Sequence, residues 1–306
     1  MQLIQQSLEG LKLGAPQVHL NLALYPLTSP GNAAPGYLLL DEALERKLAR
    51  VTEVSSQGSV PELAFENGSA EKILLVDGDE LVGAKQNRVL NLTILVGGGK
   101  RVVIPVSCVE QGRWAYRRPD FAPAGRALFA RARAKKMQRV SESLRNRGRA
   151  QADQGEVWAD VADKAKFLHM ESPTLAMSDF YEQSAARLAD YESAFRAEPG
   201  QRGAVVAIDG RVTGVELFDS AQAFARYLAK LVRSYALDAL ETANGQHRAP
   251  PAAEVERFLE RLRQASIETF AALGEGEDIR LAGERLSGGA LAAGGRIVHL
   301  AGFAAA

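Results

Sequence analysis

The stretch RVLNLTILVGGGKRVVIPVSCV, residues 88–109, carries the strongest secondary-structure signal in the chain. Two apolar, β-branched runs, residues 88–96 and 101–109, flank a Gly-Gly-Gly-Lys linker at 97–100, and this pattern predicts a β-hairpin. The linker lacks the Ser/Thr and the following helix of a phosphate-binding loop, so we interpret it as the hairpin tip. Pro105 cannot donate to a strand ladder, which places the second strand at an edge or a bulge there.

The segments on either side of this hairpin predict a mixed fold. Residues 15–120 are rich in strand signals, residues 122–197 have helical periodicity, and residues 203–243 predict a hairpin turning at Asp209-Gly210 and then a helix. Residues 252–306 predict a C-terminal helix and short strands. The fold class is therefore α+β, with antiparallel hairpins in the N-terminal part, a helical middle, a second small β section and C-terminal helices. We expect one domain over 1–245 and an appended one over 252–306.

The composition is that of an ordinary globular protein. A chain of 306 residues with 46% hydrophobic and 24% charged residues can bury a substantial core, which argues against global disorder. The formal net charge is zero, and the one cysteine excludes an internal disulfide. No run approaches the roughly 18 apolar residues of a membrane span, and the first residues lack the features of a secretory signal. We therefore expect a cytoplasmic protein without a membrane partner.

Polar side chains crowd the ends of the two predicted strands, within the segment 76–114. A centred hairpin would pair Val89 with Cys108 and Asn87 with Glu110. Cross-strand partners share a face, as do residues two apart. This register predicts two faces, with Lys85, Asn87, Cys108 and Glu110 on one, and Gln86, Arg88 and Ser107 on the other.

This cluster has a functional and a structural interpretation. In the functional one, Glu110 is a catalytic general base and Lys85 binds a phosphate or carboxylate of the substrate. In the structural one, the same two residues form a cross-strand ion pair on a solvated face. The ligand-binding candidates that would complete a site are Gln86, Asn87, Arg88, Arg113 and Trp114.

The remaining reactive groups have plainer explanations. No histidine is close in sequence to Cys108, so packing is favoured over a role as nucleophile. We expect no metal site, because the acidic residues at 77, 79 and 80 lack the spacing of a calcium-binding loop and Asp77-Gly78 is explained as a tight turn. His169 and His299 have no ligand-like neighbours and are assigned core or surface roles.

A basic segment follows the polar cluster. Residues 113–149 contain twelve Lys/Arg and two acidic residues, a local net charge of +10 in a chain that is neutral overall. The segment favours a solvated helix whose cations pair with acidic residues elsewhere. The alternative is a nucleic-acid-binding surface with Trp114, Tyr116 and Phe121 for stacking. Its phosphate contacts would be Arg131, Arg133, Lys135, Lys136 and Arg139.

Two blocks of the sequence resemble a known family. Residues 78–88, GDELVGAKQNR, and 104–114, IPVSCVEQGRW, resemble an uncharacterised prokaryotic domain family associated with ADP-ribosylglycohydrolases and rhodanese-phosphatases. Residues 203–218, ending in Val-Glu-Leu-Phe, resemble a later block of that family, so the resemblance covers about residues 15–245. It implies a connection with nucleotide or ADP-ribose metabolism in a prokaryotic stress or conflict pathway, and it transfers no catalytic residue.

Three hypotheses remain open at this point. The first is binding or processing of a small anionic, nucleotide-like ligand, possibly related to ADP-ribose or NAD, at the polar cluster. The second is nucleic-acid binding through residues 113–149. The third is a non-catalytic assembly subunit, a homo-oligomer with the hairpin at its interface. The sequence defines neither a reaction nor a cofactor.

Overall fold

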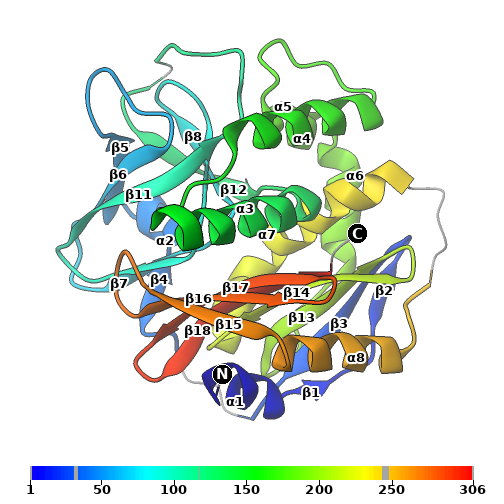
Figure 1. Ribbon diagram of the computed structural model, residues 1–306. Coiled ribbons are helices and arrows are strands. Elements are labelled where there is room, and N and C mark those ends of the chain that lie inside the picture. The colour runs from blue at the N-terminus through cyan, green and yellow to red at the C-terminus, as the bar shows by residue number, and fades with distance from the viewer. Residues whose placement is uncertain (1, 31–33, 117, 243–247, 305–306) are drawn as a thin grey trace.

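The structure, a computed structural model, describes residues 2–30, 34–116, 118–242 and 248–304. These residues form eight α-helices and eighteen β-strands. A large sheet lies on one side of the molecule and two smaller sheets on the other, with helices between and around them (Figure 1). The predicted α+β fold with an antiparallel N-terminal part is confirmed.

The large sheet has nine strands, which come from the N-terminal, middle and C-terminal parts of the described chain. Its centre is the hairpin of β13 (Gln201–Ile208) and β14 (Arg211–Phe218), which turns at Asp209 and Gly210 with φ of 51° and 72°. Positive φ at both turn residues is what a two-residue hairpin loop requires, so this hairpin prediction is confirmed. The outer strands are β1 (Lys12–Leu13), β2 (Gln17–His19), β3 (Leu22–Thr28), β15 (Ser266–Ala271), β16 (Glu277–Gly283), β17 (Leu286–Ala293) and β18 (Arg296–Ala304).

The smaller sheets surround the polar cluster. One has six strands in the order β12-β8-β9-β11-β6-β5, and the other has three in the order β10-β7-β4. All their neighbours are antiparallel except β4 and β7. Their bounds are β4 (Tyr37–Leu39), β5 (Ala49–Glu53), β6 (Glu62–Asn67), β7 (Lys72–Leu75), β8 (Asp79–Gly83), β9 (Arg88–Leu90), β10 (Ile94–Val96), β11 (Arg101–Cys108) and β12 (Phe121–Ala127).

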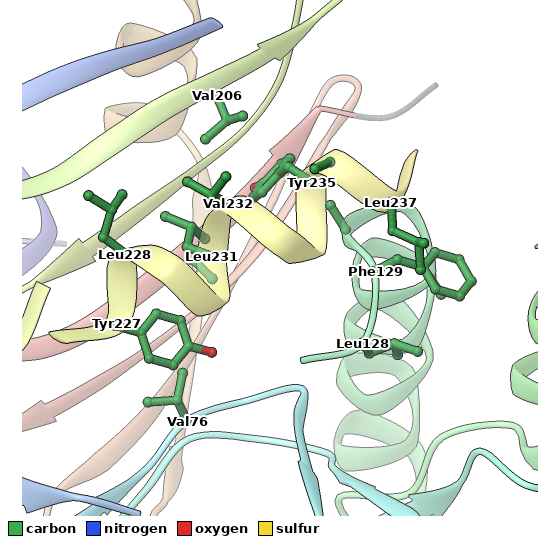
Figure 2. Packing of buried hydrophobic residues seen from close by; sticks show 14 of the residues in the cluster. Val76, Leu128, Phe129, Val206, Tyr227, Leu228, Leu231, Val232, Tyr235 and Leu237 are labelled. Carbon is green, nitrogen blue, oxygen red and sulfur yellow. The ribbon is translucent and has the colours of Figure 1, made fainter. Parts of the chain in front are cut away.

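Helix α7 (Ala221–Ala239) lies between the large sheet and the smaller ones and is buried on most of its surface. Its apolar side chains face both layers, whereas Gln222, Arg226 and Arg233 lie on a narrow, more exposed stripe. Its Val232 lies toward Val206 of β13, and its Tyr227 lies toward Val76 on the other side (Figure 2). Helices α1 (Gln2–Glu9) and α8 (Ala252–Arg263) contribute to a second core with strands of the large sheet. The other helices are α2 (Leu40–Glu45), α3 (Ala130–Arg147), α4 (Gln154–Phe167), α5 (Met177–Gln183), α6 (Ala185–Ala194) and the 3-10 turn η1 (Leu240–Thr242).

The predicted 88–109 hairpin is wrong in its pairing. The first run divides into β9, which pairs with β8 and β11, and β10, which pairs with β7 in another sheet. The second run pairs with β6 over Arg101–Pro105, and Asn67 at the end of β6 donates its side-chain amide to the carbonyl oxygens of Val96 and Gly97, at 3.3 and 3.0 Å. Pro105 lies where β11 exchanges partners: it is the last residue paired with β6, and pairing with β9 begins at Val106.

The register is also shifted by one residue. Cys108 lies opposite Arg88 and not opposite Val89, so the predicted assignment of faces is wrong for Cys108. A shift of one residue moves a side chain to the other face of a strand. A second correction concerns residues 122–127, expected to be helical, which belong to β12. Pro123 and Gly125, with φ of 62°, oppose a helix there.

Candidate functional site

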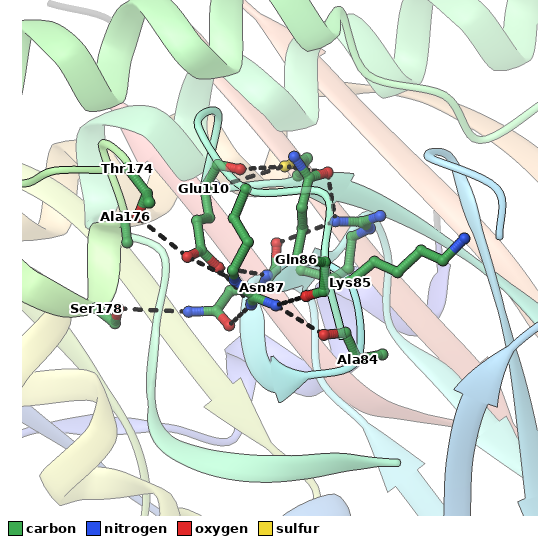
Figure 3. Close-up of polar contacts among 12 residues, drawn as sticks. Ala84, Lys85, Gln86, Asn87, Glu110, Thr174, Ala176 and Ser178 are labelled. Atoms are coloured by element: carbon green, nitrogen blue, oxygen red, sulfur yellow. Dashed lines mark hydrogen bonds and ion pairs between the residues drawn. The ribbon is translucent and has the colours of Figure 1, made fainter. Parts of the chain in front are cut away.

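Glu110 lies at the centre of the polar cluster, just after β11, and has no exposed surface. Its Oε1 accepts hydrogen bonds from Arg113 Nε at 2.8 Å and Thr174 Oγ1 at 3.1 Å. Its Oε2 accepts from Arg113 Nη2 at 2.6 Å and from the Asn87 backbone N–H at 3.1 Å. Figure 3 shows Glu110 and Asn87 side by side, with Thr174 and Ser178 approaching from another segment. The prediction that Asn87 and Glu110 lie together agrees with this geometry.

This environment keeps Glu110 ionised. Burial raises the pKa of its carboxyl group, but the hydrogen bonds from Arg113 and from the Asn87 N–H lower it further, and the net pKa lies below the ordinary value. A general base needs a free lone pair and a pKa near the working pH. Glu110 meets neither condition in this arrangement, so the geometry fits a positioning role better than proton abstraction.

Arg113 ties the turn before β9 to the loop after β11. Besides its two bonds to Glu110, Nη1 donates to the carbonyl oxygens of Ala84 and Ala115 at 2.7 and 2.8 Å, and Nη2 donates to Asn87 Oδ1 at 3.2 Å. These contacts use all five N–H groups of the guanidinium. Arg113 therefore organises the site and has no donor left for a ligand.

Cys108, Gln86 and Arg88 form a second group on the other face of the strands. The Cys108 Sγ lies 3.1 Å from Gln86 Oε1, which also accepts from Arg88 Nη1 at 3.0 Å. Burial raises the pKa of the Cys108 thiol more than the nearby Arg88 guanidinium lowers it. The Gln154 side-chain amide bonds both backbone groups of Cys108, each at 2.8 Å. These contacts match the packing role expected for Cys108.

Arg88 is the unusual member of this group. Its side chain has no exposed surface, and within the described ranges Nε and Nη2 have no hydrogen-bond partner. Its guanidinium carbon lies 5.7 Å from the centre of the Trp114 ring. A buried donor without a partner costs about 1–3 kcal/mol, and more when charged, so such a group calls for an explanation.

Lys85 is separate from Glu110, contrary to the predicted face assignment. Its side chain extends away from the carboxylate (Figure 3), donates to the Gln57 carbonyl oxygen, and places Nζ 5.1 Å from the Trp114 ring and 5.2 Å from the Tyr116 ring. The register shift does not affect Lys85, which precedes β9; the turn before that strand directs it outward. Trp114 and Tyr116 are 48% and 52% exposed, so both rings are accessible for stacking.

An open pocket of about 580 Å³ lies beside Lys85 and Tyr116, a volume within the range of small-molecule sites. It is formed by the end of β5, the loop that follows it and the loop after Tyr116. The sequence indicates Trp114 and Tyr116 as stacking groups. It does not predict the other residues of the pocket, because nothing in the spacing joins residues near 53 to those near 118. The lining residues are Thr52, Glu53, Ser55, Ser56, Tyr116, Arg118 and Pro119.

The five basic candidates for nucleic-acid binding all form ion pairs within the chain. Arg133 and Lys136 are buried and face inward from α3. Arg131 and Arg139 are partly exposed, but each is matched to a carboxylate. This is the arrangement expected of a helix whose cations pair with acidic residues elsewhere. The pairs are Arg131–Glu241, Arg133–Glu216, Lys135–Asp160, Lys136–Asp77, Arg139–Glu142 and Arg139–Glu156.

A further polar cluster, missed in the sequence, joins the two layers of sheet. His299 Nδ1 lies 2.9 Å from Thr93 Oγ1, and its Nε2 lies 2.8 Å from Glu216 Oε1, which Arg133 also contacts. These residues are far apart in sequence, so spacing could not reveal the cluster. The adjoining cavity has a volume of about 10 Å³, the size of one water molecule. The cluster is therefore suited to joining the layers and not to holding a larger ligand.

Two chemical limits follow from the part of the chain that the structure describes. It contains no group of three or more His, Cys, Asp or Glu side chains arranged to hold a metal ion. In the same residues, no helix is both long and apolar enough to cross a bilayer.

The fold and site define an α+β protein in which a buried carboxylate–guanidinium pair organises the turns beside an open pocket edged with aromatic and basic side chains. The chain belongs to the family of the ARG and Rhodanese-Phosphatase-superfamily-associated Protein domain, ARPP-1, whose model matches residues 10–303. The resemblance seen in the sequence is confirmed, and the match extends beyond the expected 15–245 into the C-terminal strands. No curated protein and no solved structure matches the chain.

Proposed function

We propose that the protein binds a small anionic, nucleotide-like ligand at the pocket beside Tyr116. The observation that carries this proposal is Arg88, a buried guanidinium with two donor atoms unused in the described chain, next to an accessible tryptophan. Buried charges in proteins are ordinarily paired. A ligand that brings a hydrogen-bond acceptor to Arg88 would provide the missing partner.

The charges around the pocket support the same ligand class. Arg118 lines the pocket, Lys85 Nζ lies over the ring of its Tyr116, and Arg88 lies near Trp114, whereas Glu53 is the one carboxylate among the described lining residues. Lys and Arg are the usual protein partners of phosphate oxygens. The exposed Trp114 and Tyr116 rings offer the stacking surface that a base requires. A ligand with both phosphate and planar parts fits these groups.

The family name gives a first ligand to test. It links the domain to ADP-ribosylglycohydrolases, which supports ADP-ribose or an NAD-related compound as the ligand and a role in prokaryotic stress or conflict. In this proposal Glu110 and Arg113 position the turns, while Lys85, Arg88 and Trp114 contact the ligand. No reaction is assigned.

Calorimetric titration of ADP-ribose, AMP and pyrophosphate into the intact chain tests the proposal. We expect saturable binding, a raised melting temperature, and a fivefold or greater loss of affinity in Lys85→Ala. Lys100→Ala, at the exposed turn that follows β10, is the matched control and should bind like the wild type. Absence of binding by all three compounds at millimolar concentration would refute the proposal.

A further inference from the structure

Two buried groups of opposite charge near the pocket lie close without meeting. Glu53 is 9% exposed and Arg88 is fully buried. In the described residues, Glu53 Oε2 has no hydrogen-bond partner, nor do Arg88 Nε and Nη2. Burial lowers the pKa of Arg88, and the carboxylate of Glu53 acts against that shift, so Glu53 lies within the electrostatic reach of the guanidinium.

Glu53 has an unused hydrogen-bond acceptor and Arg88 has unused donors. One kind of ligand group would satisfy both. A planar amide edge presents an N–H donor next to a C=O or ring-nitrogen acceptor, as in the carboxamide of nicotinamide or the amino edge of adenine. Its donor would bond Glu53 and its acceptor would bond Arg88. Because the two protein charges cancel, a neutral group is preferred between them to a second anion.

We infer that Glu53 and Arg88 together recognise the amide-like edge of a base, which makes the ligand of the proposed site a nucleotide and not merely an anion. This inference rests on the proposed function and adds orientation to it. The base edge lies inward at Glu53, stacked near Trp114, and the phosphate lies outward at Lys85 and Arg118.

Access to Glu53 passes the turn at Ser55–Gly58, whose Ser56 lines the pocket. A Cβ added at Gly58 would lie 3.3 Å from Glu53 Oε2, so this turn covers the carboxylate. The turn is held by the Tyr116 hydroxyl, 3.4 Å from the Ser56 carbonyl oxygen, and by Lys85 on the Gln57 carbonyl oxygen. Both residues also belong to the proposed ligand site, so a bound phosphate would compete with the Gln57 carbonyl oxygen for Lys85.

The test compares four 5′-phosphates on the intact wild-type protein by calorimetry. AMP and nicotinamide mononucleotide carry an amide-like edge, purine riboside 5′-monophosphate lacks the adenine amino group, and ribose 5-phosphate lacks a base. We expect at least one of the first two to bind ten or more times as tightly as either of the others. Which of them does so identifies the base.

Glu53→Met provides the second arm, because methionine has similar length and no acceptor. This variant should lower the affinity for the preferred nucleotide tenfold and leave the affinity for ribose 5-phosphate unchanged. Glu62→Gln on the neighbouring strand should alter neither affinity. If all four phosphates bind alike in the wild type, the inference is overturned and the proposed function stands. If none binds, both fail. The wild-type comparison does not depend on whether the variant folds.

Discussion

Glu110 follows β11 and Arg88 begins β9, the strand paired with it, yet the environments of the two side chains differ completely. Glu110 has four donors around one carboxylate, whereas Arg88 has donors for which the described chain supplies no acceptor. A saturated charge holds structure in place, and an unsatisfied one is available to a ligand. The two residues therefore call for different experiments, one on stability and one on binding.

Glu110→Gln should destabilise the fold strongly. The change leaves the nearly buried Arg113 guanidinium without its carboxylate, and breaking a buried pair from one side costs about 3–5 kcal/mol. Urea unfolding at neutral pH measures the loss. Glu268→Gln, which breaks an exposed pair with Arg145, should leave the unfolding midpoint nearly unchanged. Equal behaviour of the two variants would mean that Glu110 is not the organising group described above.

Asp79 should make stability depend on pH in the opposite sense to an ordinary carboxylate. Burial raises its pKa to about 6, against the attraction of Lys230. The folded state therefore binds a proton more readily than the unfolded one, and this carboxyl disfavours folding above pH 6 and ceases to do so as the pH falls towards 4. The free energy of unfolding of the wild type, minus that of Asp79→Asn, should fall by roughly 1–3 kcal/mol between pH 4 and pH 7. A flat difference across that range contradicts the assignment.

Helix α3 directs two of its cations, Arg133 and Lys136, into the protein interior. Arg133 contacts Glu216 of β14, and Lys136 contacts Asp77 at the turn before β8. The helix thus fastens the large sheet to the smaller ones. The five cations that first suggest a nucleic-acid surface, Arg131, Arg133, Lys135, Lys136 and Arg139, all form ion pairs within the chain.

Arg133→Met should therefore cost roughly 3–5 kcal/mol of stability, because it leaves Glu216 buried and unbalanced. The exposed Arg139→Met on the same helix should change the denaturation midpoint little. Chemical denaturation of both variants measures the two changes in the free energy of unfolding. Fluorescence anisotropy with duplex DNA at two salt concentrations adds an independent readout: salt-dependent binding lost in Arg139→Met would favour the nucleic-acid hypothesis instead.

Elements that depend on residues adjacent in sequence could be predicted, whereas strand pairings with partners distant in sequence could not. The β13–β14 hairpin follows from Asp209-Gly210 and the apolar runs on either side of it. The 88–109 run has equally clear strand chemistry, but it pairs with β6 and β7, which lie outside the run. The same holds at the site: Asn87 and Glu110 were placed together correctly, whereas the approach of Glu53 to Lys85 depends on the folded loops.

At the scale of the whole molecule, the C-terminal residues complete the large sheet. β18 pairs with β14 over Gly214–Phe218, and β15, β16 and β17 continue outward from it. The second core joins side chains of α1, β3 and β14 to others of α8 and these strands. A boundary near residue 250 would divide both the sheet and this core.

Ending the chain at residue 251 should therefore abolish cooperative folding, because it uncovers the β14 edge and the apolar face beneath it. Size-exclusion chromatography and thermal unfolding of the truncated chain give the measurement. Deleting residues 2–9, which removes α1 but no strand, should leave a folded though less stable protein. If residues 1–251 fold as a stable monomer, the predicted division into 1–245 and 252–306 gains support.

The pairing of Gln154 with Cys108 has a consequence for self-association. Beyond Pro105, β11 has β9 on one side and, among the described residues, no strand on the other, where the Gln154 amide bonds both backbone groups of Cys108. An open strand edge invites a strand from another molecule. Here one side chain at the start of α4 occupies the backbone groups of Cys108 that a strand from another molecule would need in order to extend the sheet.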